Sequence, residues 1–288
     1  MKKILIAAMV VAWLGGGAVK LYAQDEAVAP PKVLLIDREA VKLGQSRAHE
    51  KSEEAFVRAA ESVKLPTHYL AATTLSGPSE AFFLIGFDSY AQWGEDEKWG
   101  DQPKIEALLG GLMEKDSDFL TAADQVVATY NDKWSYQPNV DLSSMRFMEM
   151  ETIVRRPGHD KEWEDLIALY QATAAKVNLD EHDVFYESHY GAQNGTVYIF
   201  TPRKSYADLD ASMEAGKGFD AALGPDGMKK WSELIEATVE SDSAQLLEFS
   251  PTMSYAPEAW VKADPTFWKP KPAAAVAPKA AAPVEKKN

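Results

Sequence analysis

The chain has 288 residues and a formal net charge of −14 at pH 7, and 46% of it is hydrophobic, with 8 Trp, 11 Tyr and 11 Phe. It contains no cysteine, which excludes disulfides, thiolate nucleophiles, cysteine zinc sites and iron–sulfur clusters, so an apolar core must supply its stability. Because an acidic body repels phosphate backbones and anionic lipids, we expect no nucleic-acid partner.

The two ends of the chain differ in composition from the rest. Residues 1–23 combine a lysine-rich start, an apolar stretch and a possible cleavage site, which is typical of a signal peptide. The stretch is shorter than a membrane span and ends at Lys20, so we expect cleavage, no membrane span in the mature chain, and a periplasmic or secreted location. An uncleaved anchor is the alternative. Residues 262–288 are rich in Pro, Ala and Lys, which predicts a disordered tail.

The first half of the folded region, residues 32–138, alternates strand and helix patterns. We predict a strand at 33–41, a helix at 46–64, strands at 68–75 and 81–87, helical sequence at 89–123 with a break near 100–103, and a last strand at 126–134.

The second half, residues 145–257, gives the same order of elements. We predict strands at 145–155, 183–190, 196–201 and 244–249, and helices at 160–177, 206–215 and 225–239. Both halves are therefore β-α-β-β-α-β, the pattern of ferredoxin-like domains.

Three short similarities between the halves indicate a tandem duplication. A ferredoxin-like half leaves one sheet face bare, so we expect the two halves to pack sheet to sheet and cover each other. The similar segments are Ser89-Tyr90-Ala91 with Ser205-Tyr206-Ala207, Ser135-Tyr136-Gln137-Pro138 with Ser254-Tyr255-Ala256-Pro257, and His49-Glu50-Lys51 with His159-Asp160-Lys161.

The start of the second half resembles a known superfamily. Its strand is followed by Arg155-Arg156-Pro157-Gly158-His159-Asp160-Lys161-Glu162-Trp163, which is similar to the strand, Pro-Gly and charged-aromatic helix start of the dimeric α+β barrel superfamily. That group includes NIPSNAP-like proteins and antibiotic-biosynthesis-monooxygenase-like domains. The resemblance implies an α+β fold in which one chain forms a pseudo-dimeric barrel, and hence a monomer. The first half departs from the pattern, because it has Leu43-Gly44 without the proline.

The densest group of polar side chains lies on the predicted strand 183–190. Because side chains alternate along a strand, Phe185, Glu187 and His189 share one face and could meet a ligand in a cavity between the halves. Glu149 and Glu151 share a face of their own strand and join this site if the two strands are neighbours. A hydrogen-bonded polar patch is the alternative interpretation of the whole group.

Two further histidines, His49 and His159, stand at helix starts that the similarity makes equivalent. A helix N-terminus disfavours imidazolium, so either could act as a neutral ligand or base, unless both are merely exposed first-turn residues. We predict no metal site, because the histidines are too dispersed to supply a ligand set. By analogy with relatives in the superfamily, haem would use His189 as its axial ligand, although the sequence requires no cofactor.

Two functions remain open. The first is an exported small-ligand-binding or accessory protein that holds its ligand between the halves, and the absence of phosphate loops, dinucleotide motifs and nucleophile elbows favours it. The alternative is a cofactor-free oxygenase- or isomerase-like enzyme that uses Glu187 and His189 as a base pair.

Overall fold

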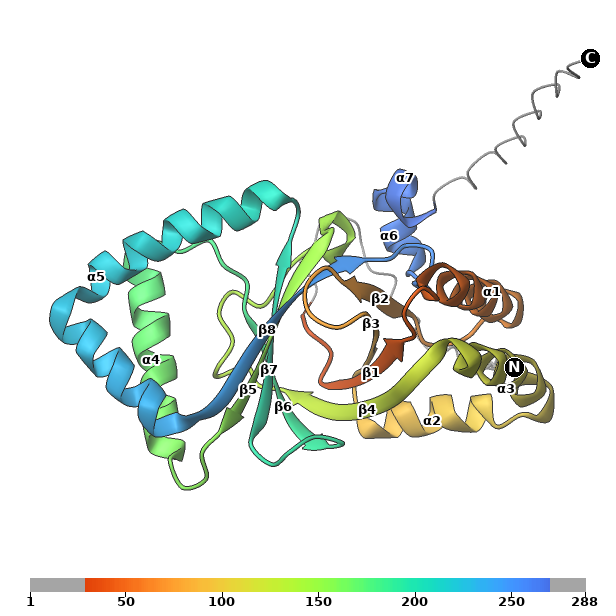
Figure 1. The fold of residues 1–288 in the computed structure, drawn as a ribbon, viewed down its shortest axis with the longest axis horizontal. Helices are drawn as coiled ribbons and strands as arrows, with labels where there is room; N and C mark the ends of the chain where they lie inside the picture. Colours follow the sequence, from red (N-terminus) through yellow and green to blue (C-terminus); the bar gives the residue numbers. More distant parts are fainter. Residues whose placement is uncertain (1–28, 270–288) are drawn as a thin grey trace, which may run out of the picture.

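A computed structural model describes residues 29–269, which form an α+β fold around eight antiparallel strands (Figure 1). The predicted α+β class is confirmed. The signal peptide predicted at residues 1–23 and the part of the predicted tail beyond residue 269 lie outside the described residues.

The first half begins with the strand β1 and ends with the strand β4. Its elements are β1 (Val33–Val41), α1 (Ser46–Val63), β2 (Tyr69–Thr74), β3 (Glu80–Phe87), α2 (Tyr90–Gly100), α3 (Pro103–Asp116) and β4 (Leu120–Tyr130).

The second half begins with β5, and two short helices follow its last strand. Its elements are β5 (Phe147–Arg155), α4 (Asp160–Val177), β6 (Val184–Tyr190), β7 (Thr196–Arg203), α5 (Tyr206–Thr238), β8 (Val239–Phe249), α6 (Glu258–Ala263) and α7 (Pro265–Trp268). Single-turn 3-10 helices precede β4 and β5.

The strands close into one barrel in the order β1-β3-β2-β8-β5-β7-β6-β4, with β4 paired to β1. The first four strands therefore stand in the order β4-β1-β3-β2 and the last four in the same order, β8-β5-β7-β6. The β1/β4 register slips between Ala40 and Val41, and the β5/β8 register slips at the same place in its own strand, between Val154 and Arg155. The two groups of strands meet along β2/β8 and β4/β6.

Side chains alternate between the inside of the barrel and its outer surface. In β1, Leu34 and Ile36 belong to the large apolar cluster inside the barrel, whereas Val33 and Leu35 belong to a cluster on the outside. Helices α1 to α3 lie beside the first four strands, and α4 and α5 cover the last four from the opposite side (Figure 1). Both faces of the sheet are therefore buried, which explains why strands such as β3 are apolar on both sides.

The two helices predicted in the second half follow each other directly and meet at a kink within the range labelled α5. The kink lies at Gly224, whose φ of 64° and ψ of 179° are not helical, directly before Pro225. Proline cannot donate the backbone hydrogen bond that a straight helix needs, and glycine adopts the positive φ at little cost. The sequence signal for a break was therefore correct, but the chain resumes its helix at once.

The start of the predicted tail is wrong, because the chain remains folded through α6 and α7. The Trp268 side chain is only 4% exposed and belongs to the apolar cluster inside the barrel. Its indole N–H donates to the Ser143 carbonyl oxygen at 2.8 Å. Trp268 and Phe267, together with the Arg146–Asp264 ion pair, thus anchor a segment whose composition indicates disorder.

Within residues 29–269, none of the helices combines the length and the apolar character that a bilayer crossing requires.

Candidate functional site

The strand β6 carries three of the seven predicted site residues, and its two faces lie in different surroundings. Val184 and Tyr186 point into the barrel, whereas Phe185 packs in the outer cluster beneath α4 and α5. Because side chains alternate, Glu187 and His189 lie on the outward face with Phe185. The three residues do share a face, but the prediction that this face lines a space between the halves is wrong.

Glu187 and His189 also contact different partners. Glu187 accepts a hydrogen bond from Arg155 Nη2 at 2.9 Å, and the His189 Nε2 atom lies 2.7 Å from the Thr129 hydroxyl oxygen. His189 is exposed and lines neither of the two cavities described below. These residues form no enclosed acid–base pair, and the surroundings of His189 do not fit an enclosed haem.

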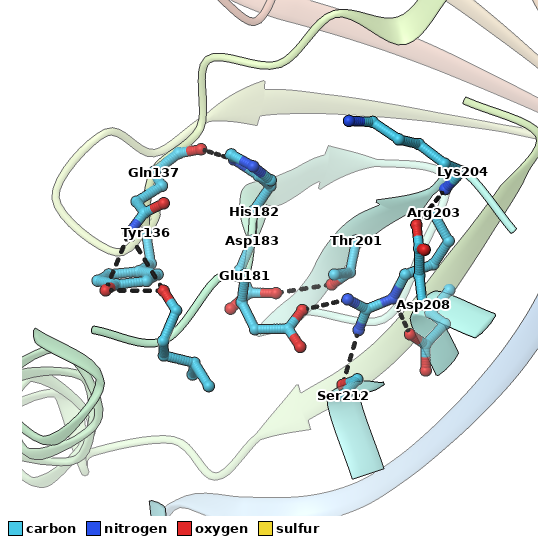
Figure 2. Close-up of polar contacts among 12 residues, drawn as sticks. Tyr136, Gln137, Glu181, His182, Asp183, Thr201, Arg203, Lys204, Asp208 and Ser212 are labelled. Atoms are coloured by element: carbon cyan, nitrogen blue, oxygen red, sulfur yellow. Dashed lines mark hydrogen bonds and ion pairs between the residues drawn. The ribbon is translucent and has the colours of Figure 1, made fainter. Parts of the chain in front are cut away.

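Glu149, whose side chain is 41% exposed, takes part in an ionic network around Arg203 on the outward face of the sheet. Figure 2 shows Arg203 in contact with Glu181 and Ser212 of this network. Arg203, at the end of β7, donates from Nε to Glu149 at 2.6 Å, from Nη1 to Glu181, and from Nη2 to the Ser212 hydroxyl at 3.0 Å. Since all three guanidinium nitrogens are bound, we interpret this arginine as a structural link between β5, β7 and α5.

Asp183 is partly buried beside this network. Its carboxylate accepts hydrogen bonds from the Thr201 hydroxyl at 2.7 Å and from the Tyr170 hydroxyl. Burial raises the pKa of Asp183 above its ordinary value. Asp183, Tyr170 and Arg203 line a cavity of about 260 Å³ beneath α5, but their polar atoms bond mainly to one another, so a ligand would have to break those bonds.

Glu151, another predicted site residue, lies on the same outward face of β5, and residues 29–269 supply no ionic partner for it. Burial, followed by repulsion from Asp242, Asp183 and Glu149, raises its pKa to about 6. The folded chain therefore holds this proton more tightly than the unfolded chain does. The stability that Glu151 contributes is fully present below its unfolded pKa of about 4.5 and is lost as the pH rises through about 6.

We expect Glu151→Gln to stabilise the protein by on the order of 1–2 kcal/mol at pH 7.5 and to have little effect at pH 4.5, because glutamine does not ionise. Urea unfolding of the wild type and the variant at both pH values measures this difference. An equal effect of the substitution at the two pH values would contradict the burial argument.

His159 and His49 occupy different places in their helices, so the predicted equivalence is wrong. His159 is the N-cap residue of α4 and is 42% exposed, with Nδ1 lying 3.8 Å from Glu162. His49 is the fourth residue of α1 and only 2% exposed. The residue of α4 at the position of His49 is Trp163.

His49 lies in a cluster of four ionisable side chains between the sheet and the helices of the first half. His49 and Glu53 are one turn apart on α1, so they share a face of that helix. Glu39 points outward from β1 toward them, in phase with Val33 and Leu35. We call the four residues the His49 cluster; they are Glu39, His49, Glu53 and Asp116, the last residue of α3.

The donor atoms of the His49 cluster lie close to one another. The His49 Nε2 atom is 2.8 Å from Glu39 Oε2 and 3.5 Å from Asp116 Oδ2. One nitrogen or oxygen atom from each of the four residues can be chosen such that all lie within 4.8 Å of one another.

Two of the three carboxyl groups, those of Glu53 and Asp116, have raised pKa values. Burial first, and then the neighbouring Glu39 and Asp116, raise the pKa of Glu53 to about 8. Burial also raises the pKa of Asp116, although His49 acts in the opposite direction. Asp116 is 4% exposed, and within the described residues neither of its carboxylate oxygens has a hydrogen-bond partner. Its Oδ2 atom has only the 3.5 Å contact with His49 Nε2. Perturbed pKa values and an unpartnered buried carboxylate are typical of a functional site.

The matching positions of the second half carry apolar side chains. These positions are the seventh residue of the first strand, the fourth and eighth residues of the first helix, and the fourth residue before the last strand. In the second half they are occupied by Ile153, Trp163, Ile167 and Ile235, which all pack in the outer cluster. Since an apolar cluster fills this place equally well, the fold itself does not require four ionisable groups there.

A cavity of about 440 Å³ lies beside the His49 cluster, where β2 meets β8. Residues of both halves surround it, together with α7. They include Ser46, His49, Thr74, Glu248, Met253 and Phe267. His49 thus belongs both to the cluster and to the wall of a space large enough for a small organic molecule.

Sequence reasoning identified only His49 of this cluster. The spacing of four residues between His49 and Glu53 was a usable signal, because it places an imidazole and a carboxylate on one helix face. Glu39 and Asp116 are far from them in sequence, and only the packing of α1 and α3 against β1 brings them together.

Comparisons with known proteins concern the fold. Neither models of protein families nor curated protein sequences give a match. An anthrone oxidase-like protein of known structure is 10% identical, with a TM-score of 0.52 over 76% of this chain and 92% of its own. A proposed monooxygenase from Fusobacterium nucleatum subsp. nucleatum is 11% identical, with a TM-score of 0.50 over 77% and 94%. A variant of chlorite dismutase from Candidatus Nitrospira defluvii is 10% identical, with a TM-score of 0.49 over 81% and 96%.

The first two of these similarities agree with the superfamily that the sequence resembles. The chain has a fold of the dimeric α+β barrel type, as predicted. Membership of the NIPSNAP-like group and the tandem duplication stay predictions.

Proposed function

We propose that this chain is an oxygenase-type enzyme whose active centre is the His49 cluster, with the adjacent cavity as its substrate site. The observation that carries the proposal is a buried imidazole, bound to one carboxylate and beside an unpartnered second one, in the wall of a 440 Å³ cavity. The structural relatives named as a monooxygenase and as anthrone oxidase-like favour the same class. The enzyme hypothesis is therefore preferred, but with His49 in place of His189.

The chemistry follows from the pairing of His49 with Glu39. A carboxylate 2.8 Å from one ring nitrogen orients the imidazole for general base catalysis. A suitable substrate is a small aromatic compound with an acidic C–H bond, because the carbanion left after proton removal can react with O₂. Oxidation of a methylene group to a ketone consumes one O₂, places one oxygen atom in the product and releases the other as water.

We also infer that the chain is a tandem of two ferredoxin-like units, in which the first carries the site and the second is filled by apolar residues. The common strand order and the common register slip support this inference. Each unit covers the other's bare sheet face, so we propose a monomer. The signal-like N-terminal sequence supports export to the periplasm or beyond.

Oxygen uptake with anthrone as the probe tests the proposed function. We expect wild-type protein to consume O₂ faster than the uncatalysed reaction, and His49→Asn to lose at least about 100-fold of that rate, as general bases typically contribute 10²–10⁴-fold. His189→Asn is the matched control and should keep the wild-type rate, because His189 is exposed and outside the cluster.

Two outcomes would contradict the proposal. Loss of activity in His189→Asn but not in His49→Asn would show that the active site lies on β6, at His189, and not at the His49 cluster. Binding of anthrone and related aromatic compounds in the cavity without any oxygen uptake would favour the accessory ligand-binding function instead.

A further inference from the structure

We propose that the His49 cluster binds one divalent transition-metal ion, of the class of Mn²⁺, Fe²⁺ or Zn²⁺. The inference deepens the proposed function, since it concerns the same site, but it is tested by metal binding alone and does not depend on turnover.

The positions of the donor atoms suit such an ion. Bonds of about 2.0–2.2 Å from nitrogen and oxygen ligands place two donors on opposite sides of a metal about 4.2 Å apart. The four donors of the His49 cluster lie within 4.8 Å of one another, so small side-chain movements bring all four to a common ion. They come from β1, α1 and α3, so the packing of three elements fixes them.

The charges of the His49 cluster also favour the binding of a cation. Three carboxyl groups surround a single imidazole. Asp116 is more than nine-tenths buried, and among the residues that the structure describes neither of its oxygens is hydrogen-bonded, with His49 Nε2 3.5 Å from Oδ2. A buried acceptor without a partner costs free energy, and a carboxylate costs more than a neutral group. A divalent ion at the centre would bind the free oxygens of Asp116 and offset the repulsion between the carboxylates.

The second half supplies an internal comparison. Isoleucine and tryptophan fill the matching positions there without buried charge. The four ionisable residues are therefore dispensable for packing, which leaves ligand binding as the simplest reason for their presence together.

The donor set indicates the kind of ion. One imidazole and three carboxylates form a harder set than the thiolates that select Cu⁺, while the imidazole favours Mn²⁺, Fe²⁺ or Zn²⁺ over Ca²⁺ and Mg²⁺. The cavity in which His49 forms part of the wall gives an approach for the ion and for a further ligand.

The test uses the full chain after treatment with a chelator and dialysis. Mn²⁺, Zn²⁺ and, without oxygen, Fe²⁺ are added separately, and the bound metal and the thermal unfolding midpoint are measured. We expect one equivalent of at least one of these ions to bind, and the midpoint to rise by about 5–10 °C when the ion is at about 100 times its dissociation constant.

Substitutions that preserve shape separate this site from the acidic surface. We expect Asp116→Asn and Glu53→Gln each to weaken binding at least about tenfold, since even residues that only support a metal ligand typically contribute 10–100-fold. Glu151→Gln is the matched control, because it removes a largely buried carboxylate outside the cluster, and it should bind as the wild type does.

Two results would overturn the proposal. One is binding well below one equivalent for all three ions, with no thermal shift, in the wild-type protein, which decides the question even if a variant fails to fold. The other is equal binding by the wild type, Asp116→Asn and Glu53→Gln, which would place the ion on exposed carboxylates. Metal binding without oxygen uptake would leave this inference standing while the proposed reaction fails.

Discussion

Replacing Trp163 with alanine is expected to lower the free energy of unfolding by about 3–5 kcal/mol. Trp163 is 2% exposed, and its ring lies edge-on to Trp134 at 5.6 Å between centroids. The Arg155 guanidinium lies 5.6 Å from the Trp163 ring. Because the indole nitrogen has no hydrogen-bond partner, the expected loss comes from packing, from the cavity left beneath α4 and from the weakened cation–π contact.

Urea unfolding followed by circular dichroism measures this change. Leu43→Ala is the control, because Leu43 is 99% exposed and its removal should change the stability by less than about 0.5 kcal/mol. A loss below about 1 kcal/mol for Trp163→Ala would mean that the outer cluster of the second half collapses to fill the space, contrary to the close packing expected of a core.

Replacing Arg203 with methionine is expected to cost about 3–5 kcal/mol, the usual result of removing one partner of a buried ion pair. Arg203 and Glu181 are both less than a tenth exposed, and Glu149 shares the same guanidinium. Methionine keeps an unbranched apolar side chain in place of the arginine stem but leaves the Glu181 carboxylate buried without a cation. The loss in the free energy of unfolding should therefore come from the Glu181 carboxylate, which no longer has a cationic partner.

A double-mutant cycle isolates that charge effect. Adding Glu181→Gln to Arg203→Met should recover part of the lost stability, because it removes the unpaired carboxylate, whereas Glu181→Gln alone should destabilise the protein. Strictly additive effects of the two substitutions would show that the pair is not coupled and that the network contributes only packing.

The elements with the strongest periodic patterns could be predicted from the sequence. The strand at 33–41 and the helix at 160–177 have the predicted bounds. The strand β4 begins six residues before its predicted start, because its first residues are largely exposed and lack apolar alternation, and pairing with β1 alone makes them a strand. Tertiary pairing of this kind leaves no local signal.

The candidate site was harder to predict, for a physical reason. Alternation along β6 correctly groups Phe185, Glu187 and His189, but it cannot tell which face points into the barrel when both faces are buried against apolar material. The His49 cluster joins Glu39 and Asp116, which are 77 positions apart in the chain. Their proximity depends on the packing of helices on the sheet, which no local pattern encodes.

The closure of the barrel has a consequence for association between copies of this chain. Within residues 29–269, each of the eight strands has a neighbour on both sides, so the barrel offers no free row of backbone donors and acceptors. Growth by strand addition, the common route from folded sheets to fibrils, is thereby blocked unless a seam opens. The β2/β8 seam is the shortest, with three paired residues on each side, so it is where such opening would begin.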